Sequence, residues 1–106
     1  MMDLRKLGMV GLASIASWGA HAQDASTKLQ TRTLVASCAS CHGTDGRPVE
    51  GSSVPALAGI PKATLTAQMK AFKEGTRPAT IMHQLSKGYT DDQIDRISTY
   101  FAALKR

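Results

Sequence analysis

Aromatic side chains are scarce in this 106-residue chain: they make up 5% of it, and Trp18 is the single tryptophan. The other four aromatic residues lie at positions 72, 89, 100 and 101. A chain this short buries a modest share of its surface, and such chains often need a further stabilising element, such as a disulfide or a bound metal, besides their core. The scarcity of aromatic residues therefore predicts that a large apolar body other than side chains completes the core.

Several other features are missing as well. The net charge of +5 is mild, and no basic run is dense enough to indicate nucleic-acid binding. The one apolar stretch, near the N-terminus, falls short of the about 20 residues that a membrane-spanning helix needs. No alternating pattern typical of a β-strand occurs. The sequence therefore predicts an all-α protein with no membrane span in its mature chain.

The first 22 residues are typical of a secretory signal peptide. Arg5 and Lys6 precede the apolar stretch, and Ala20-His21-Ala22 matches the A-x-A pattern of a cleavage site. We therefore expect residues 1–22 to be removed, and residues 23–106 to form one domain outside the cytoplasm.

The run Cys38-Ala39-Ser40-Cys41-His42 has the C-x-x-C-H pattern of covalent c-type haem attachment. Two thiols three positions apart can each add to one vinyl group of a haem and form a thioether. The adjoining histidine then lies at the iron as its proximal ligand. We predict one covalent haem c, held by Cys38 and Cys41 and ligated by His42. Because c-type haem is attached outside the bacterial cytoplasm, the signal peptide and the motif together predict a periplasmic protein.

Two other chemistries use the same residue types. A redox dithiol of the C-x-x-C kind occurs in a βαβ context, which this chain lacks, and it gives His42 no role. A structural zinc site needs four ligands, usually in two separated pairs. The mature chain offers only Cys38, Cys41, His42 and the distant His83. Both alternatives stay open, and haem is favoured.

A helix is expected over residues 27–37, leading into the C-x-x-C-H run. Its apolar stripe is weak, with Leu29, Thr33 and Ala36 on one face. The following residues, 43–59, contain four glycines and two prolines, which predicts an irregular loop around the cofactor.

Two further long helices are expected in the second half of the chain. The first starts at Pro61 and stops at Gly75, with apolar residues at helical spacing at positions 65, 69 and 72. The second follows a capping box formed by Thr90 and Gln93, with an apolar face at positions 94, 97, 101 and 104. Between them, residues 77–87 form a proline turn and a short apolar group.

The opposite side of the iron needs a sixth ligand or stays open. Met82 follows the proline turn, outside a long helix, where the backbone can present its sulfur to iron. Met69 lies on an apolar helical stripe, where core packing is its ordinary role. His83 is a competing ligand, although an exposed imidazole near the haem edge is the simpler interpretation. We predict His42 and Met82 as the axial pair, as in the His/Met-ligated cytochromes.

The mature chain resembles a class I cytochrome c from about residue 33 to residue 103. Within that family it most resembles the cytochrome subunit of flavocytochrome c sulfide dehydrogenase. The likeness rests on residues 54–59, 72–82 and 87–92. Its more specific parts are Arg77-Pro78-Ala79-Thr80-Ile81-Met82 and Lys87-Gly88-Tyr89. The resemblance implies a small fold of three longer helices and loops around one haem c.

The resemblance also implies roles for individual residues. Cys38 and Cys41 would form the thioethers, and His42 and Met82 would be the axial ligands. The carbonyl of Pro55 would accept a hydrogen bond from the proximal histidine and tune the iron.

The implied function is electron transfer. An FAD-containing sulfide dehydrogenase subunit would deliver electrons, and a downstream cytochrome or respiratory chain would receive them. By itself the chain would not be an enzyme. A free periplasmic cytochrome of the c553 or c4 kind is the first alternative, and a haem-based ligand sensor is the second.

Overall fold

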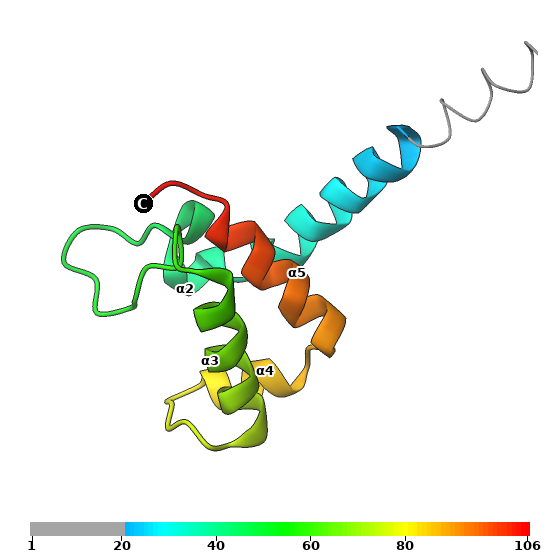
Figure 1. The fold of residues 1–106 in the computed structure, drawn as a ribbon. Coiled ribbons are helices and arrows are strands. Elements are labelled where there is room, and N and C mark those ends of the chain that lie inside the picture. The colour runs from blue at the N-terminus through cyan, green and yellow to red at the C-terminus, as the bar shows by residue number, and fades with distance from the viewer. Residues whose placement is uncertain (1–20) are drawn as a thin grey trace, which may run out of the picture. The chain divides into compact units, whose positions relative to one another are not determined.

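Helices account for all the regular secondary structure in residues 21–106, the part of the chain that the computed structural model describes (Figure 1). The all-α class predicted from the sequence is confirmed. Apart from its last two residues, the predicted signal peptide lies outside the described residues. The helices are residues 21–36, α2 (Ala39–His42), the 3₁₀ helix η1 (Thr44–Gly46), α3 (Lys62–Glu74), α4 (Met82–Lys87) and α5 (Asp91–Ala102).

The chain divides after Arg32 into two separate units. The described part of the first unit, residues 21–32, is helical and mostly exposed. Its threonines bond back one turn: Thr27 Oγ1 and Thr31 Oγ1 each donate to the carbonyl four residues earlier, at 3.0 Å. None of the helices in residues 21–106 is long and apolar enough to cross a membrane.

The first helix differs from its prediction in both extent and buried face. It already includes residue 21, and on the predicted face Leu29 is 67% exposed while Thr33 and Ala36 are also exposed. The side chain that enters the core is Val35, at 6% exposure. Only the last turn of this helix belongs to the unit that holds the core, and in that turn Val35 and, in part, Leu34 are the side chains that pack on it.

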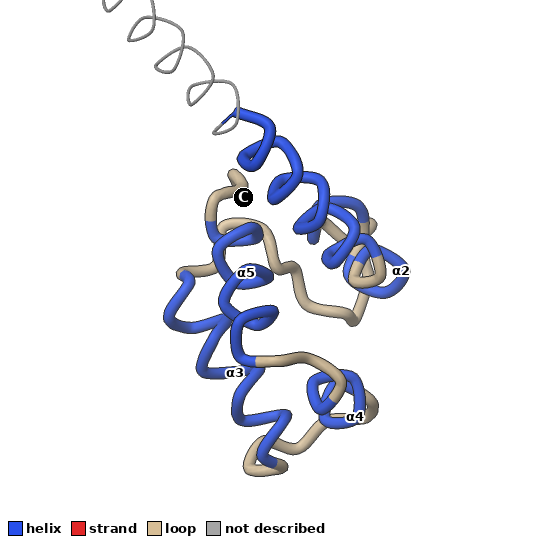
Figure 2. Tube along the Cα trace, turned by 90° about the vertical axis from the view of Figure 1, so that its right-hand side faces the viewer, coloured by secondary structure: helices blue, strands red, loops and turns tan. Residues whose placement is uncertain are grey.

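The core lies between α3 and α5. Leu65 from α3 packs with Ile97 and Phe101 from α5 and with Val35, and each is at most 6% exposed. α3 packs against both α4 and α5, and Figure 2 shows these helices joined by loops. The apolar spacing that predicted α3 and α5 therefore marks the faces that meet in the core.

The ends of α3 and α5 follow local chemistry. Pro61 takes the N-cap position, so α3 begins at Lys62, one residue later than predicted. Gly75 ends the helix in the left-handed region at φ 78°. At the start of α5 the capping box is confirmed. Gln93 N donates to Thr90 Oγ1 at 3.2 Å, and Thr90 N donates to Gln93 Oε1 at 2.9 Å.

The loop that follows α2 is tied to α5 at both of its ends. Tyr100 Oη donates to Asp45 Oδ1 at 2.8 Å, and Gly59 N donates to the Phe101 carbonyl at 2.9 Å. Gly43 makes the first bend at φ 80°, where a Cβ atom would lie 2.1 Å from the Arg47 carbonyl oxygen. Only glycine fits there, and the bend directs the loop back across the core.

Candidate functional site

The two thiols lie on one turn of helix. Cys38 is the N-cap residue of α2 and is half-buried, whereas Cys41 lies within α2 and is exposed. His42 N donates to the Cys38 carbonyl at 2.9 Å, and this bond closes the turn. Residues three apart share a helix face, so both sulfurs belong to one side of α2. Both cysteines are free.

Burial raises the pKa of the Cys38 thiol, because the thiolate is poorly solvated there. A hydrogen bond from Ser37 opposes this effect without cancelling it. A thioether sulfur carries no charge, so the same burial does not penalise it. The environment of Cys38 therefore suits an uncharged, covalently modified sulfur better than a reactive thiolate.

His42 is buried, at 9% exposure, and its ring is fixed by a single hydrogen bond. Its Nδ1 lies 2.7 Å from the carbonyl oxygen of Pro55 in the loop after α2. A carbonyl can only accept, so Nδ1 carries a proton, and in the neutral ring Nε2 then keeps its lone pair. That lone pair is what a metal ion binds. The contact between Pro55 and His42 implied by the sequence resemblance is present.

The two methionines have different surroundings. Met69 on α3 packs against the core, and the buried Ser86 hydroxyl donates to its sulfur at 3.6 Å. Met82 is the first residue of α4 and is half-buried. The sulfur of Met69 is thus already used in the packing of α3 against α4, which agrees with its predicted core role.

His83 is half-buried, which differs from the exposed imidazole that we expected. It is the second residue of a helix packed on α3, and this packing covers part of the ring. Its Nδ1 is buried and has no hydrogen-bond partner among the described residues. No feature of the sequence distinguishes this environment from an exposed one.

The structure brings Cys38, Cys41, His42 and Pro55 together, and it places Met82 on a separate element. In Figure 2, α2 and α4 lie on the same side of the α3–α5 pair. Residues from these two helices can therefore contact a common cofactor from two directions. Two free thiols on one helix face and an imidazole with a free Nε2 fit a covalently attached haem.

The zinc alternative lacks ligands. Within residues 21–106, no group of three or more histidine, cysteine, aspartate or glutamate side chains is arranged to hold a metal ion. The four ligands of a structural zinc site are therefore not assembled in the part of the chain that the structure describes.

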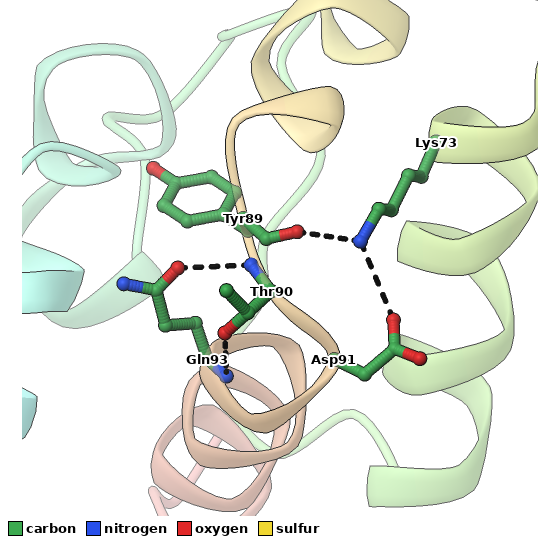
Figure 3. Close-up of polar contacts among 5 residues, drawn as sticks. All are labelled: Lys73, Tyr89, Thr90, Asp91 and Gln93. Atoms are coloured by element: carbon green, nitrogen blue, oxygen red, sulfur yellow. Dashed lines mark hydrogen bonds and ion pairs between the residues drawn. The ribbon is translucent and has the colours of Figure 1, made fainter.

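Several contacts around the site were not predicted from the sequence. Lys73 Nζ donates to the Tyr89 carbonyl at 2.7 Å (Figure 3). The Tyr89 hydroxyl lies 3.4 Å from Ser37 Oγ. These pairs are 16 and 52 residues apart in the chain. Tyr89 belongs to the Lys-Gly-Tyr stretch noted in the sequence, but only the fold reveals its partners.

Comparison with known proteins adds to this geometry. The sequence model of the family described as cytochrome c matches residues 29–105. The chain is 36% identical over 80 residues to the cytochrome subunit of sulfide dehydrogenase from Chlorobaculum tepidum, an alignment that covers 76% of this chain and 71% of that protein.

Two other relatives are named thiosulfate dehydrogenase electron acceptor. The protein from Thiomonas intermedia is 32% identical over 105 residues, which is 99% of this chain and 44% of the relative. The protein from Stutzerimonas stutzeri is 38% identical over 68 residues, which is 61% of this chain and 31% of the relative. This chain therefore spans less than half the length of either electron acceptor.

Proposed function

The chain belongs to the cytochrome c family, and on this premise we propose that it is the haem subunit of a sulfide dehydrogenase. Haem c is its cofactor and, when bound, supplies the one-electron couple of its iron. The protein transfers electrons and is not itself the enzyme. A flavoprotein partner oxidises sulfide and delivers the electrons, and a downstream cytochrome or respiratory chain receives them. The support for sulfide is the relative from Chlorobaculum tepidum.

Cys38 and Cys41 hold the haem through thioether bonds. The position of both residues on one turn of α2 supports this assignment, as do their free thiols. Two covalent bonds to a short helix keep the cofactor in place through repeated oxidation and reduction, whichever partner is bound. The protein thereby serves as a carrier that does not lose its electron-transfer group.

His42 is the proximal ligand, and its hydrogen bond to Pro55 is the observation that carries the proposal. The bond fixes the tautomer and the ring plane, so Nε2 would be available to bind a haem iron without reorientation of the ring. It also raises the electron density on the imidazole. The Pro55 carbonyl therefore stabilises the ferric state, and its distance from Nδ1 is one control on the reduction potential.

Met82 is the sixth ligand. Its place at the start of α4 supports this role, and the bond from Ser86 to the sulfur of Met69 favours Met82 over the other methionine. A His/Met pair raises the reduction potential relative to more basic axial pairs. With His42 and Met82 both bound to its iron, a haem here would have no vacant site for oxygen or peroxide, which suits electron transfer.

The periplasm is the proposed location. The basic region and the A-x-A pattern of the N-terminus support export, and c-type haem attachment takes place on that side of the membrane. A sulfide-oxidising flavoprotein in the same compartment would meet this chain directly.

A thiosulfate dehydrogenase is the second candidate partner. It is favoured by the two relatives named as electron acceptors of that enzyme. A free periplasmic shuttle, which exchanges electrons with several proteins and binds none of them stably, is the remaining alternative within electron transfer.

The test is native purification of the tagged mature protein from its own periplasm, with haem and flavin absorbance followed across one sizing column. We expect flavin to elute with haem and sulfide to reduce the haem in those fractions. The same extract from cells that lack this chain is the control for unbound flavoprotein.

Three other results would redirect the assignment. Reduction by thiosulfate and not by sulfide would identify the second candidate. Haem that elutes alone, and is not retained by added flavoprotein, would identify a free shuttle. Strong carbon monoxide binding by the unmodified ferrous protein would contradict electron transfer, because it requires an open or easily displaced axial position.

A further inference from the structure

The proposed ligand Met82 lies in a segment, residues 75–89, that connects α3 to α5. The segment leaves α3 at Gly75, and the N–H groups of Thr76 and Arg77 both donate to the Ala71 carbonyl, at 3.0 and 3.2 Å. These bonds fix its first residues to the end of α3. The position of Met82 then depends on the packing of α4 against α3 and on what holds the other end of the segment.

Lys73 holds that other end (Figure 3). Its Nζ donates to the Tyr89 carbonyl at 2.7 Å, and it lies 3.4 Å from Asp91 Oδ1. Lys73 is in the last turn of α3, where the segment begins, and Tyr89 is where the segment ends. One side chain therefore joins the two ends of the stretch that carries Met82.

The Tyr89 carbonyl needs this donor. The first backbone bond of α5 runs from Ile94 N to the Thr90 carbonyl, at 2.9 Å, so the carbonyl before it lies outside the ladder of the helix. The Lys73 side chain is 32% exposed, and a charged donor in partial shelter makes a stronger bond than a neutral one. The Asp91 carboxylate is 74% exposed and contributes less.

Tyr89 also contacts the part of the site that carries the thiols. Its hydroxyl lies 3.4 Å from Ser37 Oγ, next to Cys38. The residue that Lys73 holds is thus in contact with the turn that carries the first thiol. Displacement of Tyr89 would alter the spacing between the thioether side and the methionine side of the haem.

From these contacts we propose that Lys73 is a positioning residue for Met82. Its ammonium group closes the 75–89 segment and keeps the methionine sulfur at the iron, and loss of this bond frees the segment to swing away. The inference rests on the proposed role of Met82 as axial ligand. It assigns Lys73 a part in ligand retention that is separate from its part in stability.

Binding of imidazole to the ferric holoprotein tests this, because imidazole can bind only when Met82 has left the iron. At about pH 8 imidazole is mostly neutral, so the loss of a lysine charge does not attract or repel it. Lys73→Met keeps the length of the side chain and removes its donor. We expect its apparent affinity for imidazole to rise about tenfold, the effect of one lost charge-assisted hydrogen bond.

Two variants control for charge and for the ion pair. Lys70→Met removes an exposed charge from the same helix, and Asp91→Asn removes the ion pair but leaves the carbonyl bond. We expect each to change the affinity by no more than about twofold. Melting temperatures of all variants, measured alongside, separate a loss of stability from a loss of ligation.

The outcomes are distinct. An unchanged affinity in Lys73→Met overturns the proposal even if the melting temperature falls, and an equal rise in Lys70→Met overturns it too. If the result for Lys73→Met contradicts the proposal, Met82→Ala shows whether the role of Lys73 or the assignment of Met82 as ligand is wrong. If this variant binds imidazole far more tightly than the native protein, the proposed ligand stands and only the role of Lys73 is lost. If it does not, the ligand assignment itself is wrong, and the role of Lys73 falls with it.

Discussion

The imidazole of His42 and the carbonyl of Pro55 are 13 residues apart in the chain and 2.7 Å apart in the fold. The bond joins α2, which carries the thiols, to the loop that returns across the core. It therefore couples the orientation of a proposed iron ligand to the conformation of that loop. Several measurable consequences arise from this and related contacts.

The His42 Nδ1 proton is expected to be protected from solvent exchange. A buried donor bonded to a carbonyl exchanges slowly, whereas a proton on an accessible imidazole exchanges fast. Nitrogen-15 NMR of the ferrous holoprotein would detect the proton as a sharp resonance. Pro55→Ala keeps the carbonyl and should keep the resonance. Loss of the signal in the native protein would show that the bond is not maintained in solution.

Replacement of the cysteines is expected to loosen the cofactor stepwise. Cys38→Ser or Cys41→Ser leaves one thioether, so the haem should stay attached but show the spectrum of a haem with one unreacted vinyl group. The double variant should release haem into acidified organic solvent and lose part of its helical signal, because we expect the cofactor to complete the core of so short a chain. Ser40→Ala, between the two cysteines, is the control. Release of haem from the native protein by the same extraction would refute covalent attachment.

The two methionines are expected to respond differently to substitution. Met82→Ala should open the sixth position and create carbon monoxide binding by the ferrous protein. Met69→Leu should leave ligation intact but cost about 1–3 kcal/mol, because the buried Ser86 hydroxyl loses its acceptor. Gas titration and denaturant unfolding report the two effects separately. If Met69→Leu created carbon monoxide binding and Met82→Ala did not, Met69 would be the ligand.

Two glycines with similar backbone angles are expected to differ in their tolerance of alanine. Gly46 and Gly51 have φ of 68° and 80°, so alanine costs about 1–2 kcal/mol at either position. At Gly46 the new Cβ would also lie 2.9 Å from both Leu57 and Phe101, whereas at Gly51 nothing lies within 4 Å. Gly46→Ala should therefore lose about 1–3 kcal/mol more in denaturant unfolding. Equal losses would mean that the core around Phe101 adapts freely.

Local chemistry in the sequence was enough to predict α3 and α5. Gly75 and the Thr90 capping box are signals within a few residues, and they gave the C-terminal end of α3 and the N-terminal end of α5 to within one position. The predicted buried face of the first helix was wrong, because its stripe is weak and the side chains that reach the core are Val35 and, in part, Leu34.

The site was predictable in part for a similar reason. The C-x-x-C-H run is contiguous, and the Pro55 contact came from resemblance to a known family. The bonds of Lys73 and Tyr89 link residues far apart in the chain, and residue type alone does not specify them. The environment of His83 depends on how α4 packs on α3, which no local pattern encodes.

The bond from Tyr100 to Asp45 has a consequence for the order of folding. It spans 55 residues, and with the bond from Gly59 to Phe101 it can form only when the last helix has docked. Contacts between such distant parts of a chain form slowly, because the entropy of loop closure must be overcome first. We expect α2, with its thiols, to be complete while the chain is still open. An attachment enzyme would then meet an accessible motif, and the final helix would close the protein over a cofactor already in place.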